Sequence, residues 1–133
     1  MAYHPLLVPH LTEGLAALGS ERILVSRDGV VGTVTGFAIF GIVPGTEGAG
    51  RVRAIAVGPQ ARRRGLGRML MNSALETLRN RNARFVLVEL PDDPLLRRFE
   101  SLLSSSGFVE ETRAADLVRD GVAMRYLRRY FDD

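Results

Sequence analysis

The stretch that decides the fold runs from Ala54 to Arg68 and reads AIAVGPQARRRGLGR. It begins inside the apolar run Val52–Val57, which is typical of a buried strand, and it leads into a segment with helical spacing of apolar residues. Gly65 and Gly67 lack a Cβ, so the backbone between strand and helix can approach an anion closely. The first N–H groups of a helix have no intrahelical partner and lie at the positive end of its dipole. The stretch therefore predicts a strand, a phosphate loop and a helix start that bind a phosphorylated ligand.

Four arginines in this stretch supply forked cationic donors that suit phosphate oxygens: Arg62, Arg63, Arg64 and Arg68. A solvated turn without a ligand is the structural alternative. A nucleic-acid site is a further alternative, but the first three arginines form a compact triplet without interleaved aromatic residues, and the formal net charge is only +3. Nucleic acid is therefore disfavoured as a partner.

The same stretch resembles the acetyl-CoA signature of the GNAT superfamily of N-acetyltransferases, Arg/Gln-x-x-Gly-x-Gly/Ala. Arg62, Gly65 and Gly67 stand at its three fixed positions. The order of elements around it also resembles the family: a strand, a loop, a helix, a strand at Phe85–Leu90, a second helix, and Ser-Gly-Phe before a terminal hairpin. The resemblance spans roughly residues 22–130. It implies an α/β (α+β) fold with a mixed, mostly antiparallel sheet, two central splayed parallel strands, flanking helices and a shortened N-terminus.

The resemblance further implies acetyl-CoA as co-substrate, with no metal. Its phosphates would bind at the loop and helix start, formed by Arg62, Arg63, Arg64, Gly65, Leu66, Gly67 and Arg68. The splayed strand would offer backbone groups of Ile55, Ala56 and Val57 to the pantetheine amides and to the thioester carbonyl, in the manner of an oxyanion donor.

The general base is not at its most common position. Many relatives carry a glutamate near the start of the strand before the loop, and the matching position here is about Arg51. Glu89 matches the position of an acidic base in some protein N-terminal acetyltransferases of the superfamily, and Glu47 is a second carboxylate within reach. A solvent-facing strand residue is the alternative reading of Glu89, which we take as the candidate catalytic residue.

The usual general acid is also missing. Relatives often carry a tyrosine four residues before the Gly-Phe pair, and the count here arrives at Leu103. Ser101, Ser104 and Ser105 lie nearby but are typical of a polar helix end, and Tyr126 is a distant substitute. Thioesters can expel a thiolate without an acid, so the absence leaves catalysis open.

Length and composition predict one globular domain spanning residues 1–133, with 46% apolar and 25% charged residues. No apolar run reaches the ~18 residues of a membrane span, and the N-terminus lacks a signal-peptide pattern, so we expect a cytoplasmic protein without membrane contact. The absence of cysteine excludes disulfides, thiolate metal sites and a cysteine nucleophile. His4 and His10 stand alone and do not suggest a metal site.

Periodicity and turn signals predict the remaining elements. The Asp28-Gly29 dipeptide indicates a two-residue hairpin, and glycines in the strand after it indicate bulges or close approaches. Asp93 and Pro94 begin the second helix. Its buried stripe is expected to comprise Leu95, Leu96, Phe99, Leu102 and Leu103. The expected segments are a helix at Pro9–Leu18, strands at Ile23–Ser26, Val30–Ile42 and Arg51–Val57, a helix at Leu66–Arg81, a helix at 94–105 ended by Gly107, and a hairpin of Phe108–Val118 with Val122–Tyr130.

These observations favour an N-acetyltransferase that moves an acetyl group from acetyl-CoA to a primary amine in a ternary complex. A catalytically weak CoA-binding regulatory or interaction module is the first alternative. The acceptor is a small-molecule amine or a peptide or protein amine. The short N-terminus leaves the acceptor side open, which suits an acceptor presented by a partner or a homodimer whose second subunit completes the site through Tyr126, Tyr130 and Phe131.

Overall fold

The computed structural model describes residues 9–15, 21–28, 32–59 and 65–131. Strands dominate both ends of the chain, and the helices lie in its second half. In chain order the elements are β1 (Pro9–Leu15), β2 (Glu21–Asp28), β3 (Val34–Ile42), β4 (Ala49–Val57), α1 (Leu66–Asn80), β5 (Phe85–Pro91), the 3₁₀ helix η3 (Pro94–Leu96), α2 (Arg97–Ser105), β6 (Val109–Arg119) and β7 (Val122–Tyr130).

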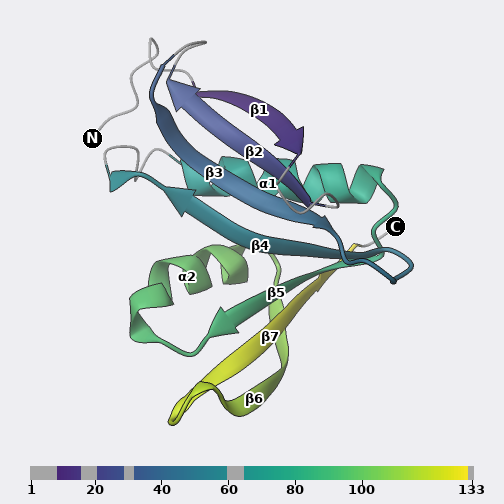
Figure 1. The fold of residues 1–133 in the computed structure, drawn as a ribbon, viewed down its shortest axis with the longest axis vertical. Coiled ribbons are helices and arrows are strands. Elements are labelled where there is room, and N and C mark those ends of the chain that lie inside the picture. Colours follow the sequence, from purple (N-terminus) through teal and green to yellow (C-terminus); the bar gives the residue numbers. More distant parts are fainter. Residues whose placement is uncertain (1–8, 16–20, 29–31, 60–64, 132–133) are drawn as a thin grey trace.

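The strands form one sheet in the order β1-β2-β3-β4-β5-β7-β6 (Figure 1). Neighbouring strands are antiparallel except β4 and β5, which are parallel and are connected through α1. The terminal hairpin places β7, and not β6, beside β5. The predicted mixed, mostly antiparallel sheet with a central parallel pair is confirmed.

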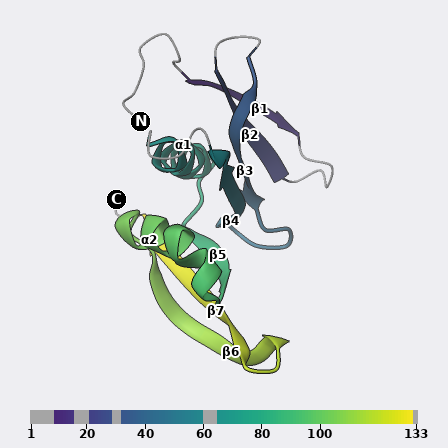
Figure 2. The ribbon, with the colours of Figure 1, turned by 90° about the vertical axis from the view of Figure 1, so that its left-hand side faces the viewer.

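The two α-helices of the described residues cover the same side of the sheet (Figure 2). α1 packs against β2, β3 and β4, whereas α2 lies beside the C-terminal strands. In the described part of the chain no helix covers the opposite side of β2–β4. One face of the sheet therefore carries the core, and we call the other, which no described helix covers, the accessible face.

The core forms where the predicted apolar stripe of α1 meets the sheet. Its members Leu66, Leu70, Met71, Ala74, Leu75 and Leu78 are all buried. They pack in one cluster with Ala38 and Phe40 of β3 and with Val52 of β4. Burial of each large aliphatic side chain contributes roughly 1.5–3 kcal/mol, so this stripe fixes α1 on the strands that lead into and out of the phosphate loop.

The helix expected at Pro9–Leu18 is wrong, because residues Pro9–Leu15 form strand β1. This strand pairs with β2 over its full length, from Pro9 opposite Asp28 to Leu15 opposite Arg22. The leucine spacing suggested a helix, but pairing along the whole edge of the sheet supplies the backbone partners that a short isolated helix would lack. The sheet therefore has a strand before β2.

The connection between β2 and β3 is longer than the predicted two-residue turn. Gly29 lies outside the described residues, but the strands end at Asp28 and begin again at Val34, and the N–H of Asp28 donates to the Thr33 carbonyl at 3.1 Å. The antiparallel β2–β3 pair itself is confirmed. So is a close approach at Gly36, where a Cβ would lie 2.8 Å from the carbonyl oxygen of Ala56 on β4.

The segment after β5 begins as predicted and then departs from the prediction. The side chain of Asp93 accepts a hydrogen bond from the Leu95 N–H, and Pro94 opens a 3₁₀ turn that continues into α2. Leu95 is 90% exposed, so its expected place in a buried stripe is wrong. Within α2 only Leu103 is buried. Gly107, at φ +88°, ends this segment in the left-handed conformation that favours glycine.

Candidate active site

The parallel strands β4 and β5 separate soon after they meet. Their pairing begins with Ala49 opposite Phe85 and ends with Arg51 opposite Leu87. Beyond that point β4 continues to Val57 and β5 to Pro91 without further pairing between them. Figure 1 shows the two arrows diverging toward α2. The splay predicted from the family resemblance is therefore present.

A bulge in β4 accompanies the separation. Ile39 pairs with Ala54 and Phe40 with Val52, so Arg53 has no opposite residue on β3. An extra residue bends a strand and increases its twist, and here it stands two positions after the last residue that pairs with β5. Sequence patterns did not predict this bulge, because Arg53 lies in an otherwise regular strand pattern.

The splay leaves backbone groups of β4 facing the gap. The N–H of Gly58 donates to the Thr35 carbonyl at 2.8 Å, which turns Gly58 toward β3. Because successive residues of a strand point their backbone groups to opposite edges, Ala56 also faces β3, whereas Ile55 and Val57 face the gap. Two of the three strand residues named for pantetheine binding therefore offer backbone groups to the gap.

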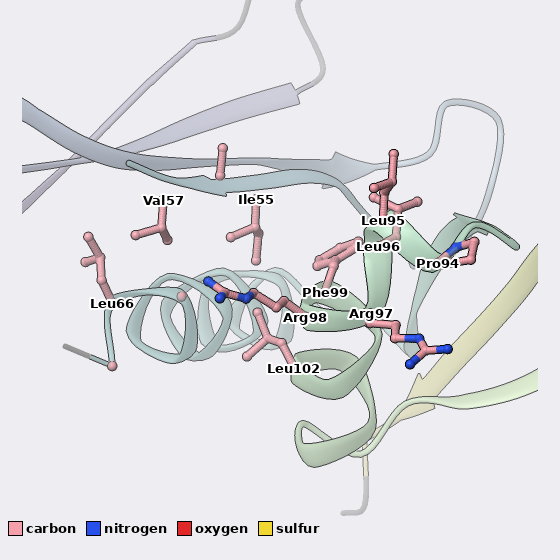
Figure 3. A pocket seen from close by; sticks show the side chains of 13 residues that line it. Ile55, Val57, Leu66, Pro94, Leu95, Leu96, Arg97, Arg98, Phe99 and Leu102 are labelled. Carbon is pink, nitrogen blue, oxygen red and sulfur yellow. The ribbon is translucent and has the colours of Figure 1, made fainter. Parts of the chain in front are cut away.

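A cavity of about 1030 Å³ lies between β4, the start of α1 and the segment around η3 and α2. Six residues named from the sequence line it: Ile55, Ala56, Val57, Gly65, Leu66 and Gly67. Figure 3 shows the side chains of Ile55 and Val57 pointing from the strand into this space, opposite Phe99 and Leu102 of α2. The splayed strand and the helix start thus border one hollow.

The start of α1 is open to a ligand. Gly65 adopts φ +72° with no atom within 4 Å of a Cβ placed there, and the helix has no side-chain cap and no acidic residue in its first turn. A Cβ on Gly67 would lie 3.6 Å from Leu102 and 3.8 Å from Val57. Within the described residues no side chain caps these first N–H groups and no carboxylate of the first turn competes for them, which favours an anion.

The arginines of the signature differ in position. Arg62, Arg63 and Arg64 lie outside the described residues. Arg68 is exposed and donates a 3.1 Å hydrogen bond to the hydroxyl of Ser105, so it connects α1 with the end of α2. Arg98, from the opposite wall, extends across the cavity toward α1 (Figure 3).

The far wall of the cavity includes several residues that the sequence predicted in a buried stripe. Leu96, Phe99 and Leu102 are half-buried and line the cavity, together with Pro94 and Leu95. The apolar periodicity predicted that these side chains face inward, but it could not indicate that they face a cavity and not the core. The cavity arises from the splay, which depends on contacts between β4 and β5.

The candidate base lies on the accessible face. Its neighbours Val88 and Leu90 are buried on the helix side, so Glu89 points to the opposite side and is exposed. It lies opposite Tyr126 of β7, and the alternation of strand side chains puts both on the same face. Glu47 also lies in the described loop before β4, where it is exposed and its backbone carbonyl accepts from Arg84.

No described residue supplies a hydroxyl at the place of the usual general acid. Leu103, at the expected count from Gly107, is fully buried in the core. One helical turn earlier, Phe99 directs an aromatic ring into the cavity (Figure 3). An aromatic side chain therefore lies on the cavity side of α2, but phenylalanine has no hydroxyl group that could donate a proton.

An ion-pair network holds α2 on the terminal hairpin. Arg125 of β7 pairs with Glu100 of α2 and with Glu110 of β6. Arg113 of β6 donates to Glu110 at 3.0 Å and to Asp92 at 3.3 Å. The hydrogen bond to Glu110, followed by the charges of Glu110 and Asp92, raises the pKa of Arg113. This network sets the position of the wall that faces β4.

Within the described ranges, no three His, Cys, Asp or Glu side chains gather as a metal site would require. No helix of the described residues is long and apolar enough to cross a membrane.

Comparison with known proteins identifies the family. Residues 3–103 match the family model described as acetyltransferase (GNAT) family. This match extends over most of the chain, so the chain belongs to the GNAT family of acetyltransferases. A search of curated protein sequences finds no significant match.

Solved structures share the fold at low sequence identity. A protein of Desulfovibrio desulfuricans assigned to the GNAT family has a TM-score of 0.79 and 22% identity, with 84% of this chain and 69% of that chain covered. An acetyltransferase of Bacillus subtilis in complex with CoA has a TM-score of 0.71 and 15% identity, covering 85% and 78%. A protein of Bacillus anthracis assigned as a streptothricin acetyltransferase, in complex with acetyl coenzyme A, has a TM-score of 0.72 and 13% identity, covering 95% and 86%.

Proposed function

We propose that this chain is a single GNAT domain, residues 1–133, that transfers an acetyl group from acetyl-CoA to a primary amine in a ternary complex. The observation that carries the proposal is the cavity between the splayed strand β4, the glycine-lined start of α1 and the wall around α2. A cytoplasmic location, expected from the sequence, is part of the proposal.

The shape and chemistry of the cavity fit the body of CoA. Unpaired N–H groups at the start of α1 suit the pyrophosphate, and Gly65 and Gly67 let the backbone come close to it. Arg98 brings a positive charge across the cavity, and Arg62, Arg63 and Arg64 precede the helix in sequence. The backbone of Ile55 and Val57 suits the pantetheine amides.

In this proposal Glu89 removes a proton from the acceptor ammonium, which gives the neutral amine a lone pair for attack on the thioester carbon. Free aliphatic ammonium groups have a pKa of ~10, so this step is needed at neutral pH. The nitrogen–carbon bond forms and the carbon–sulfur bond breaks. The nitrogen loses its second proton to solvent, and the thiolate leaves and takes a proton from solvent. A backbone N–H of β4 facing the gap stabilises the negative oxygen in between.

A CoA-binding module without significant catalysis is the second candidate. Phe99 in place of a hydroxyl donor and the solvent-exposed Glu89 favour it. Release of free thiol from acetyl-CoA in the presence of amines separates the two candidates. An enzyme releases thiol only when an amine is present, whereas a binding module shows ligand-dependent stabilisation without release.

A further inference from the structure

Two opposite charges stand on the accessible face of the sheet where β4 and β5 separate. Arg51 of β4 lies between Gly50 and Val52, which face the core side, so its side chain points to the other side. Glu89 of β5 has the same orientation, because Val88 and Leu90 are buried among core residues. Both charged side chains therefore lie on the face that no described helix covers.

Neither charge has a partner within the described part of the chain, although their neighbours do. Arg53 is bound to Glu21 at 2.7 Å, and Arg128 is bound to Glu111 at 2.8 Å. The hydrogen bond and the charge of Glu21 raise the pKa of Arg53. The adjoining cations are thus neutralised, whereas Arg51 and Glu89 make no hydrogen bond or ion pair with described residues.

The spacing of the two charges suits a small ligand. Arg51 lies opposite Leu87, and Glu89 is two residues further along β5. With ~3.3 Å per residue along a strand and ~4.8 Å between strands, their Cα atoms are roughly 8 Å apart, or somewhat more because the strands diverge. Long side chains can place their charged ends closer than this, around a group that carries both signs of charge.

We propose that the acceptor is a small amine that carries an anionic group, a carboxylate or a phosphate, a few bonds from its nitrogen. The inference rests on the proposed acetyl transfer and names the class of acceptor. The guanidinium of Arg51 binds the anion through paired N–H groups, and the Glu89 carboxylate holds the ammonium before deprotonating it. A free amino acid is the simplest member of this class.

The same arrangement disfavours other amines. An amine without an anionic group leaves Arg51 without a partner, and a polyamine brings a second positive charge toward the guanidinium. Because Glu89 is exposed and Arg51 is only half-buried, the discrimination is screened by salt, with a Debye length of about 8 Å at 0.15 M. We therefore expect the preference for anionic amines to shrink as ionic strength rises.

Matched acceptors test the proposal: alanine against alaninamide, and phosphoethanolamine against ethanolamine. Acetylation is followed as thiol release from acetyl-CoA, and binding of each amine to the CoA-saturated protein is measured by calorimetry. Hydrogen bonds to charged groups contribute enough to predict a preference of ~10-fold to 100-fold for the anionic member of a pair. The first pair measures the preference for a carboxylate, and the second measures the preference for a phosphate.

Three variants assign the preference to one side chain. Arg51→Ala removes it, Arg51→Lys keeps part of it because the charge remains, and Arg128→Gln keeps all of it because that charge is already matched by Glu111. Acetyl-CoA raises the melting temperature of all three variants as it does for the unmodified protein, because Arg51 and Arg128 lie outside the cavity lining.

Equal rates and equal binding within both pairs overturn the acceptor inference, as does a preference that survives in Arg51→Ala. Failure of every anionic amine to bind the CoA-saturated protein also overturns it. If uncharged amines or ordinary peptides are acetylated without regard to Arg51, the proposed transferase function stands and only the acceptor class falls. Absence of any melting response to acetyl-CoA defeats the proposed function itself.

Discussion

Gly67 at the start of α1 faces Leu102 on α2: a Cβ on the glycine would lie 3.6 Å from Cδ2 of the leucine. This is an ordinary packing distance, so the protein itself does not require a glycine there. The space is open because the two helices border the cavity from opposite sides. The requirement for glycine at this position comes from the ligand in our account.

We therefore expect Gly67→Val to fold normally and to lose the stabilisation by CoA, because a branched side chain fills the space beside the free N–H groups of the helix. Melting curves with and without CoA measure this loss. Asn72→Val, an exposed position on the same helix, is the matched control and retains the full response. Undiminished CoA affinity in the Gly67 variant places the ligand elsewhere.

Glu89→Gln should lower the turnover number by ~10²-fold or more, because an amide cannot accept the proton of the ammonium. The affinity for acetyl-CoA should change little, since Glu89 does not line the cavity. Thiol-release kinetics with an active amine measure the first quantity and calorimetry the second. Glu76→Gln, on the exposed side of α1, serves as control. Equal turnover in the two variants would assign the proton to solvent or to Glu47.

Phe99→Tyr should increase turnover, because it adds a hydroxyl to a ring that already faces the cavity and so supplies a donor for the leaving thiolate. A well-placed general acid raises the rate by up to ~10²–10⁴-fold, and a tyrosine at a position not optimised for this role should raise it by less.

Leu103→Tyr is the control for this prediction. Leu103 is fully buried, so a tyrosine there should destabilise the fold by about 1–3 kcal/mol without raising the rate. A higher turnover number in the Leu103 variant would contradict the placement of Phe99 at the cavity and of Leu103 in the core.

Gly36→Ala should destabilise the protein by about 1–3 kcal/mol, because its Cβ would lie 2.8 Å from the Ala56 carbonyl and neither backbone can move freely. Gly58→Ala is the control, since the nearest atom to its Cβ is the Thr35 carbonyl at an ordinary 3.5 Å. Urea denaturation of both variants gives the two free energies of unfolding. A Gly36 variant as stable as the Gly58 variant shows that β3 and β4 are not held this closely.

The sequence predicted the second half of the fold better than the first. The segments from β4 to β7 carry strong local signals: an apolar strand, glycines at a turn, a clear helical stripe and a Gly-Phe helix end. β1 carries leucines at helical spacing and becomes a strand only because β2 offers it a full edge. Such pairing depends on the following strand as well as on β1, so the leucine spacing within β1 alone does not report it.

The sequence predicted the parts of the candidate site that a local backbone motif defines. It did not predict the parts that depend on long-range geometry. The glycines of the helix start and the residues Ile55 and Val57 were found from their motif. The bulge at Arg53 and the exposure of Leu95 were not, because both depend on how segments pair and pack in three dimensions, which no local pattern reports. The unpaired state of Arg51 depends equally on which neighbouring charges already have partners.

Thermal unfolding with acetyl-CoA tests the central claim most directly. At a hundredfold excess over Kd the ligand should stabilise the folded state by ~2.7 kcal/mol, whereas free acetate should have no effect, because in the proposed function the cavity holds the body of the coenzyme and not the acetyl group alone. A rise in melting temperature with acetyl-CoA and CoA, absent with acetate, is the predicted result. An unchanged melting temperature at millimolar acetyl-CoA, with tight binding of a labelled oligonucleotide instead, would contradict the account.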